Sequence, residues 1–443
     1  MKNNNLNNPN LLQVPSYMMA IPYNLASSEI LETMVKTKSF DNIVFLNLVL
    51  DEIILSIKNS KEFIFHTETY VSETIRKVNI EFRGSLYSVK LYFKDFVKDD
   101  YLQRTYLSKE EMSALENSMG VVTEIMFNEN ICKSYLFQLK LVNTLFGEVC
   151  ALADCSSRAL FSGKWLNNMA IASVPPNTSY MYNLHIVNDN MANTWIYTEG
   201  LRRCNIYDIE FLNLNLENYQ ICSILLPYLV SNLVEHRMPK EGMPIYLGEN
   251  IYLSLHNSSD AIKKYRGIIG TNSDDRKNLH HYYLTAFAYI EHKTKELSEL
   301  VPFLVEPTFT ESLIEKERKN TMAREFFDLF VKIIEKQEVV SNLKKFVKNL
   351  KNPELQILEG RIKAAFPIDE DKVTIDRTNE NLWFKFIKNT DKKTIKGELM
   401  SEPIYIEELN SGEVVEFSYN FINDWIIFSE IGEITPENLY LLL

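Results

Sequence analysis

Glycine and the common catalytic motifs are scarce in this sequence. Only 13 of its 443 residues are glycine, so the Gly-rich loops that cradle phosphate groups are not expected. We find no Walker-type P-loop, no Rossmann glycine fingerprint, and no HExxH or GxSxG pattern. The sequence therefore carries no signature of a nucleotide-binding enzyme, a zinc protease or a serine hydrolase, and no cofactor or metal is predicted.

Cysteines and long apolar runs are also few. An odd number of cysteines without a CxxC pair argues against a disulfide framework and against a zinc ribbon. The cysteines are Cys132, Cys150, Cys155, Cys204 and Cys222. The longest apolar run, Ile221–Val230, contains Pro227 and has about half the length of a membrane span. The Asn-rich start lacks the apolar core of a signal peptide. These features predict a cytoplasmic protein with no membrane partner.

The charge balance is acidic and the apolar content is high. A net charge of −12 argues against nucleic acid or an anionic membrane as the main partner. Hydrophobic residues make up 46% of the chain and aromatic residues 12%, which is enough for well-packed cores. A chain of 443 residues is expected to form two or three domains.

Helical and strand patterns are mixed along the chain, which predicts an α+β fold with mixed or antiparallel sheets and packed helices. Residues 43–57 are apolar almost throughout and fit either a helix or a strand. Ser108 followed by Glu111 is a capping box that opens a helix. The other expected helices are 27–36, 134–148, 156–165, 217–236, 309–335 and 339–350. The expected strands are 16–23, a hairpin over 78–93, 151–155, 180–187, 194–197, 206–214, 251–255 and 282–289.

Proline-rich breaks suggest the domain boundaries. Pro175-Pro176 interrupts the first α+β region, and Pro353 ends a helical stretch. We predict a disordered tail over 1–14, an N-terminal α+β domain over 15–170 and a central α+β domain over 171–300. A helical segment over 301–352 and a β-rich module over 353–443 complete the chain.

The last part of the chain, 379–428, has the strongest strand rhythm. Turn signals recur between short apolar runs, so five short strands are expected, over 383–387, 395–399, 404–406, 414–417 and 425–428. Such strands without an internal helix favour a small barrel or a sharply bent sheet. Trp383 and Trp425 lie at its two ends. Both are expected to pack in the core, and an aromatic binding pocket is the alternative.

This module resembles the bacterial YegJ-like domain of unknown function. The resemblance is carried by Glu380-x-x-Trp383, Gly397, Glu402-Pro403, Gly412-x-Val414 and Ile422-x-Asp424-Trp425. The family usually has His where this chain has Asn381, and Asn where this chain has Ser401. A function that needed those two polar side chains is therefore not implied here.

A second stretch, Trp195–Leu212, resembles the core of an uncharacterised bacterial family of the type W-x-H-T-x-G-L-x-R-C-G, whose members carry a YegJ-like segment at the C-terminus. Matching segments include Ser134–Leu141, Leu160–Trp165 and Pro176–Tyr180. This chain has Tyr197 in place of the family's His and Asn205 in place of its second Gly. The resemblance implies a family but no activity.

The candidate site residues have structural and functional interpretations. Thr198 and Gly200 suit a turn between strands, with positive φ at the glycine. Cys204 would be a nucleophile only with a nearby base such as His185, His280 or His281, and is otherwise a buried thiol.

The charged candidates have the same two interpretations. Neighbouring His280 and His281 point to opposite faces of a regular strand and cannot both face one metal ion from it. They are expected to be a loop or strand-end pair, and metal ligation across domains is the alternative. Arg202 and Arg203 could bind a carboxylate or phosphate, or pair with the chain's own acids. Strand alternation places Ile209 inward and Asp208 and Glu210 outward, with Cys204 in the turn or on the exposed side. We expect Arg203 to be the outward contact.

We therefore predict a non-enzymatic protein-binding or adaptor protein, of which an immunity-type protein that neutralises a toxin is one form. Its expected partner is another protein. A hydrolase or transferase built around Thr198, Cys204 and the His280/His281 pair is the alternative. Phosphate or nucleotide sensing through Arg202 and Arg203 is the third hypothesis.

Overall fold

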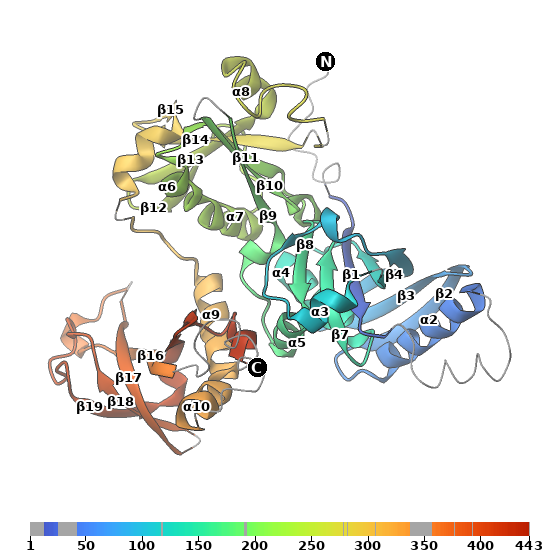
Figure 1. Cartoon of the computed structure of the whole chain (residues 1–443). Helices are drawn as coiled ribbons and strands as arrows, with labels where there is room; N and C mark the ends of the chain where they lie inside the picture. The colour runs from blue at the N-terminus through green and yellow to red at the C-terminus, as the bar shows by residue number, and fades with distance from the viewer. Residues whose placement is uncertain are drawn as a thin grey trace. The chain divides into compact units, whose positions relative to one another are not determined.

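Two compact units make up the protein, and each is assembled from separate parts of the sequence. The computed structural model describes residues 13–24, 42–116, 118–189, 193–277, 279–280, 282–305, 307–336, 357–375, 377–391 and 393–442. The first unit comprises Met1–Leu166 and Asn177–Ser312, and the second comprises Asn167–Pro176 and Leu313–Leu443. Both units combine sheets with helices (Figure 1), which confirms the α+β class.

The first unit begins with an eight-stranded sheet in the order β2-β3-β4-β6-β1-β7-β8-β5. Its strands are β1 (Ser16–Pro22), β2 (Ile64–Ser72), β3 (Ile75–Phe82), β4 (Ser85–Asp95), β5 (Leu102–Gln103), β6 (Met119–Ile125), β7 (Val149–Asp154) and β8 (Ala159–Ser162). Neighbouring strands run antiparallel, except that β5 runs parallel to β8. The expected first strand and the expected hairpin are confirmed as β1 and as β3 with β4.

The described residues of this part of the chain form four helices: α2 (Asn42–Asn59), α3 (Lys109–Ala114), α4 (Ile131–Thr144) and α5 (Gly163–Ile171). The ambiguous run 43–57 is therefore a helix. The capping box is confirmed, because the Glu111 N–H donates to Ser108 Oγ at 3.1 Å and the Ser108 N–H donates to Glu111 Oε2 at 2.6 Å. The expected helix over 156–165 is wrong: residues 156–158 form a turn, β8 follows, and α5 begins only at Gly163. The expected helix over 27–36 lies outside the described residues.

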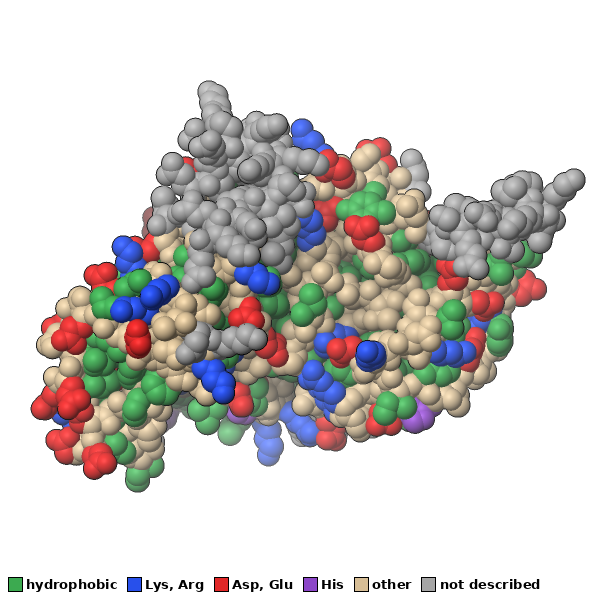
Figure 2. Space-filling view, turned by 90° about the horizontal axis from the view of Figure 1, so that it is seen from below, with side chains coloured by type: hydrophobic (Ala, Val, Ile, Leu, Met, Phe, Trp, Pro, Cys, Tyr) green, Lys and Arg blue, Asp and Glu red, His purple; other side chains and the backbone are tan. Residues whose placement is uncertain are grey.

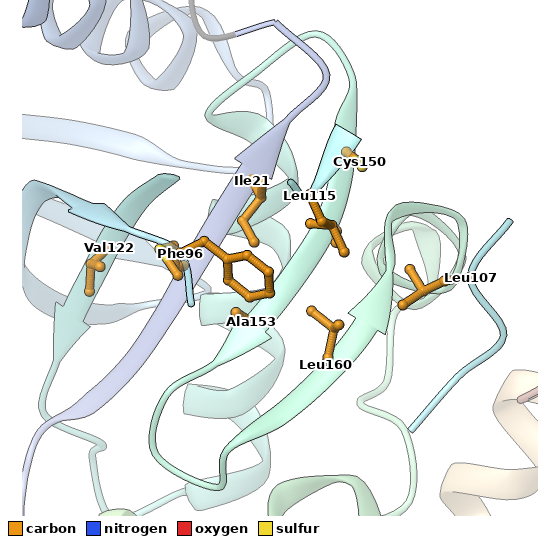
Figure 3. Packing of buried hydrophobic residues seen from close by; sticks show 10 residues of the cluster. Ile21, Phe96, Leu107, Leu115, Val122, Cys150, Ala153 and Leu160 are labelled. Carbon is orange, nitrogen blue, oxygen red and sulfur yellow. The ribbon is translucent and has the colours of Figure 1, made fainter. Parts of the chain in front are cut away.

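One hydrophobic core lies on a face of this sheet. Met19 and Ile21 from β1 and Ala153 from β7 are fully buried there. Phe96 and Leu115, from the connections around α3, cover them (Figure 3). The helix α4 packs against β1 and β6. All residues of β1 except Tyr17 are buried, and its apolar residues are almost uninterrupted, as is typical of a strand covered on both faces.

A second sheet in the same unit has the order β12-β13-β14-β11-β10-β9, and β15 pairs with β14. Its strands are β9 (Asn183–Asn188), β10 (Asn193–Glu199), β11 (Asp208–Asn215), β12 (Pro244–Gly248), β13 (Ile251–Asn257), β14 (Tyr283–Ile290) and β15 (Lys293–Lys295). The helices α6 (Tyr219–Ser223), α7 (Leu225–His236) and α8 (Ser258–Lys264) accompany it. The expected helix over 217–236 is thus two helices, with Pro227 in the first turn of α7, where a missing N–H is tolerated.

The second unit contains an open six-stranded sheet in the order β19-β18-β17-β16-β20-β21. Its strands are β16 (Ile357–Pro367), β17 (Asn379–Asp391), β18 (Thr394–Leu399), β19 (Val414–Ser418), β20 (Ile422–Ser429) and β21 (Gly432–Ile434). The helix α9 (Leu313–Glu325) packs against β20, and α10 (Phe327–Lys336) packs against β16 and β17. The expectation was a small barrel or a sharply bent sheet. Within the described residues the sheet is open and does not close into a barrel.

Two details of this unit differ from expectation. The strand β16, in the middle of the sheet, was not predicted. Residues 404–406 form a loop rather than a strand, because the Ile404 and Tyr405 N–H groups donate to the two carboxylate oxygens of Glu380 at 2.8 and 2.9 Å. The expected helix over 339–350 lies outside the described residues.

The described surface mixes charges of both signs. On the face drawn in Figure 2, basic and acidic side chains are interspersed, and neither kind gathers into one large patch. None of the helices formed by the described residues has the length and the apolar character needed to cross a membrane.

Candidate functional site

The candidate residues between 198 and 210 lie where β10 ends, a short 3-10 turn follows, and β11 begins. The turn covers Leu201–Cys204 and is preceded by Gly200 with φ of +125°. A Cβ at Gly200 would lie 2.8 Å from Ser157 Cβ and 3.0 Å from Met181 O. The predicted turn with positive φ is therefore confirmed, and only glycine fits both its backbone and its space.

Arg203 lies in the turn and is completely buried. Its Nη1 and Nη2 atoms donate to the two oxygens of Asp154, at 2.8 and 2.7 Å, and Nη1 also donates to Ser16 Oγ. Burial alone would lower the pKa of the Arg203 guanidinium, but the Asp154 carboxylate raises it above its usual value. The expectation that Arg203 reaches outward is wrong, because its side chain joins the turn to the end of β7.

Asp208 is a buried acceptor that joins three segments of the chain. Its Oδ1 atom accepts from the Thr198 hydroxyl at 3.0 Å and from the Leu201 N–H at 3.2 Å. Its Oδ2 atom interacts with His280 Nε2 at 3.0 Å. The expectation that Asp208 and Glu210 face outward is wrong, since both are fully buried. Both faces of β11 are covered, so alternation alone did not separate inside from outside.

The hydrogen bonds of His280 show which of its ring nitrogens is an acceptor. The Tyr282 N–H donates to His280 Nδ1 at 3.1 Å, so Nδ1 carries no proton. In a neutral ring Nε2 then carries the proton and donates it to Asp208. Both ring nitrogens are therefore engaged inside the protein. The predicted neighbour His281 lies outside the described residues.

Glu210 is the second buried acceptor on this face of the sheet. Trp195 Nε1 donates to its Oε2 atom at 3.1 Å, and the Thr285 hydroxyl donates to Oε1 at 2.9 Å. Arg276 forms an ion pair with the same carboxylate. Strand register places Tyr197, Glu210 and Thr285 opposite one another on β10, β11 and β14.

Aromatic rings lie beside these acids. Tyr197 stacks between His185 and Trp195, with ring centroids 4.6 and 4.3 Å away. Tyr283 stacks on His280 at 4.7 Å. His185 contacts Glu199 at 3.0 Å. The aromatic and acidic side chains thus share one face of the second sheet.

Sequence reasoning missed several members of this network. Asp154, Arg276 and Tyr283 were not singled out. Asp154 ends an otherwise apolar buried strand. Because a buried acid needs a cation or several hydrogen-bond donors, its position in the sequence could have predicted such a partner. No comparable sequence signal marks Arg276, because its partner Glu210 lies 66 residues away in the chain.

Arg202 and the two tryptophans complete the predicted residues. Arg202 lies over the Tyr282 ring at 4.4 Å. In the second unit, Trp425 is fully buried and its Nε1 donates to Ala323 O at 2.8 Å. Trp383 is half-buried, with Lys363 Nζ 5.8 Å from its ring centroid. Among the described residues, no group of three or more His, Cys, Asp or Glu side chains is placed to hold a metal ion.

Cys204 is buried, and burial raises the pKa of its thiol to about 12, although Arg203 acts in the opposite direction. Thiolates, not thiols, react with alkylating agents. We therefore expect Cys204 to remain unmodified by iodoacetamide in the native protein at pH 8, and Cys204→Ser to leave the fold intact. Peptide mass spectrometry after native labelling measures this, and full labelling in urea is the control. Rapid native labelling of Cys204 would contradict the prediction.

Asp424 offers a pH-dependent prediction in the second unit. Burial raises the pKa of its carboxyl above the usual value of 3.8, although the Trp425 N–H and nearby lysines lower it. Because the folded state favours the protonated form, this stabilisation is present below the unfolded pKa and is lost as pH rises through the folded pKa. Ionised Asp424 therefore destabilises the unit at neutral pH.

We expect Asp424→Asn to raise the melting temperature of the second unit at pH 7, by roughly 4 °C if the gain is about 1 kcal/mol. The difference from the original chain should shrink as pH falls toward 3.8. Thermal melts between pH 4 and pH 8 test this, with Asp369→Asn as a control whose folded carboxyl has a lowered pKa. A variant less stable than the original chain at pH 7 would contradict the sign.

Comparison with known families assigns most of the chain to domains. Residues 16–176 match the family described as protein of unknown function (DUF4026) N-terminal, and residues 184–286 match its C-terminal counterpart. Residues 317–434 match the family described as uncharacterized protein conserved in bacteria (DUF2314). No curated protein and no solved structure matches the chain. The chain therefore carries bacterial domains of unknown function.

Proposed function

We propose that this chain of DUF4026 and DUF2314 domains is a non-enzymatic protein-binding protein that acts as an adaptor in the bacterial cytoplasm. The observation that carries the proposal is the internal engagement of the groups that catalysis would need. Both ring nitrogens of His280 have partners, and the Thr198 hydroxyl donates to Asp208 and accepts from the Ile209 N–H at 2.8 Å. The Cys204 thiol is buried and remains protonated at neutral pH. These residues hold the fold together.

The surface that supports protein binding is the edge strand β2. It ends the eight-stranded sheet (Figure 1), and no described strand pairs with its outer edge. Ile64, Tyr70 and Val71 each leave more than half of their surface exposed. Exposed Leu86 on β4 lies in the same cross-strand row as Ile64, with Glu81 between them. An open edge with apolar side chains favours the addition of an extended segment from another protein.

The net charge and the free thiols support the proposed kind of partner and the proposed cytoplasmic location. A net charge of −12 favours encounter with a basic protein, such as a basic toxin that an immunity-type protein neutralises. All five cysteines are free thiols, as is usual in a reducing cytoplasm. The sequence pattern from Glu380 to Trp425 supports a YegJ-like identity for the C-terminal unit.

A charge-substitution experiment tests the proposal. Ile64→Lys/Val71→Lys places two charges on the β2 edge, where exposed substitutions have little effect on stability. Val97→Lys/Leu216→Lys, at two other exposed apolar positions of the first unit, is the matched control. Partners are recovered by cross-linking and co-purification, then expressed, purified and tested by calorimetry.

We expect a partner whose affinity falls at least about tenfold, or about 1.4 kcal/mol, with the β2 variant only. Equal affinities for the β2 variant and the control would remove the β2 edge from the proposal. Substrate turnover by the purified chain, abolished by His280→Gln at unchanged melting temperature, would overturn the proposal in favour of an enzyme.

A further inference from the structure

One arginine side chain in the first unit is enclosed by an acid and two aromatic rings. The guanidinium carbon of Arg276 lies 5.1 Å from the Trp195 ring centroid and 6.0 Å from that of Tyr283. Its Nη2 atom pairs with Glu210. We call Glu210, Trp195 and Tyr283 the arginine cage. A carboxylate combined with two aromatic faces is the environment that a planar guanidinium prefers.

The cage is held in shape by contacts that do not involve Arg276. The Trp195 Nε1 and Thr285 hydroxyl bonds fix the two oxygens of Glu210. Tyr197 stacks on Trp195, and its ring meets the Tyr283 ring edge-on at 6.0 Å. A site whose walls are fixed without their occupant is preorganised for a similar ligand, because little ordering remains to be done on binding.

Arg276 reaches the cage from a loop that is bonded to itself. The Gly270 N–H donates to Asp275 Oδ2 at 2.9 Å, and Arg276 Nε donates to Gly270 O. The described residues between Tyr265 and His280 form turns, with no strand or helix among them. The Arg276 side chain keeps 17% of its surface exposed while Glu210 is fully buried. The guanidinium therefore closes the cage from the solvent side.

One feature of the cage calls for a group that Arg276 does not supply. The Tyr283 hydroxyl, on a side chain only 3% exposed, has no hydrogen-bond partner among the described residues. A buried hydroxyl without a partner is costly, and a peptide carbonyl would satisfy it.

We propose that the arginine cage is a recognition site for an arginine side chain of a protein partner, and that Arg276 blocks it within the same chain. An incoming arginine displaces the Arg276 side chain, takes over the Glu210 ion pair and the two ring contacts, and offers its backbone carbonyl to Tyr283. Lysine fits less well because its compact ammonium lacks the planar face and the fork of donors. This inference rests on the proposed protein-binding function and specifies the chemistry of the partner.

The cage predicts how removal of Arg276 changes ligand binding. If Arg276 occupies the cage in about nine of ten molecules, the apparent affinity of the cage for an incoming ligand is about tenfold lower than that of an open cage. Two probes serve, N-methylguanidinium and acetyl-Gly-Arg-Gly-amide, with binding followed by tryptophan fluorescence and calorimetry on the full chain. We expect Arg276→Ala to bind both at least about tenfold more tightly than the original chain. The lysine analogue of the peptide should bind more weakly, and Glu210→Gln added to Arg276→Ala should abolish binding.

Arg237→Ala removes another arginine, 80% exposed, and should behave as the original chain does. If Arg276→Ala does not fold, Arg276→Lys keeps the charge and weakens the ring contacts, and it should still bind the probes more tightly. The proposal is overturned if neither variant binds more tightly than the original chain. It is also overturned if Arg237→Ala gains as much as Arg276→Ala.

The probes need no natural partner, so the two proposals can fail separately. If the probes bind but no protein partner is found, the arginine-cage proposal is supported and the adaptor proposal is contradicted. A reconstituted partner whose affinity is the same for Arg276→Ala and the original chain would retain protein binding and remove the cage.

Discussion

Arg203→Ala is expected to lower the free energy of unfolding of the first unit by about 3–5 kcal/mol. The substitution leaves the fully buried Asp154 carboxylate without the guanidinium that meets both of its oxygens. It also removes the donor to Met181 O. An uncompensated buried charge is the main cost, because the pair itself gains little over well-packed apolar side chains. Urea denaturation followed by circular dichroism measures the loss.

Two variants separate this charge effect from simple truncation. Arg202→Ala removes the neighbouring arginine, which lies over Tyr282 and has no ion pair among the described residues, so a smaller loss is expected. Arg203→Met with Asp154→Leu replaces both charges by apolar groups and should recover much of the stability. An unchanged urea midpoint for Arg203→Ala would show that the pair is not a structural element of the turn.

Trp425→Ala is expected to cost the second unit about 3–5 kcal/mol, the usual loss when a buried Trp is truncated. Trp425 is fully buried, and its ring lies 5.2 Å from that of Phe330 on α10. Its Nε1 donor also satisfies Ala323 O at the end of α9. The truncation therefore loosens the contact of both helices with β20. Thermal melting of the second unit measures the effect.

Two further substitutions separate the contributions to the stability that Trp425→Ala loses. Trp425→Phe keeps an aromatic ring and removes the donor, so about 1 kcal/mol plus a small cavity term is expected. Trp383→Ala should cost less than Trp425→Ala, because Trp383 is half-buried. Unchanged stability of Trp425→Ala together with lost partner binding would make Trp425 a recognition residue instead of a core residue.

Local patterns in the sequence predicted those elements whose signals are local. The Ser108–Glu111 capping box, the hairpin of β3 and β4, and the buried strand β7 follow from neighbouring residues alone. The strand β16 was missed although Ile362, Ala364 and Phe366 alternate with charged or small residues and are buried. The strand β8 was read as helix because its four residues are too short to show a period.

The candidate site was predictable as a turn but not as a network. The positive φ of Gly200 was predictable from the sequence, whereas the burial of Asp208 and Glu210 did not follow from strand alternation. Alternation assigns faces only when one face of a sheet meets water. Here His280 and Arg276, far along the chain, supply the donors that make burial of both acids tolerable. Contacts between residues this far apart in the chain cannot be predicted from a short stretch of sequence.

The second unit needs a segment that is synthesised long before the rest of it. Asn167–Pro176 belongs to this unit, and the Ser173 N–H donates to Glu325 Oε2 at 2.8 Å, while Arg318 Nη1 donates to Pro175 O. At translation rates of roughly 5–20 residues per second, that segment leaves the ribosome on the order of tens of seconds before the last strands. The unit therefore cannot complete its fold until its last strands have been synthesised, and a fragment that begins at Leu313 lacks one of the unit's own parts.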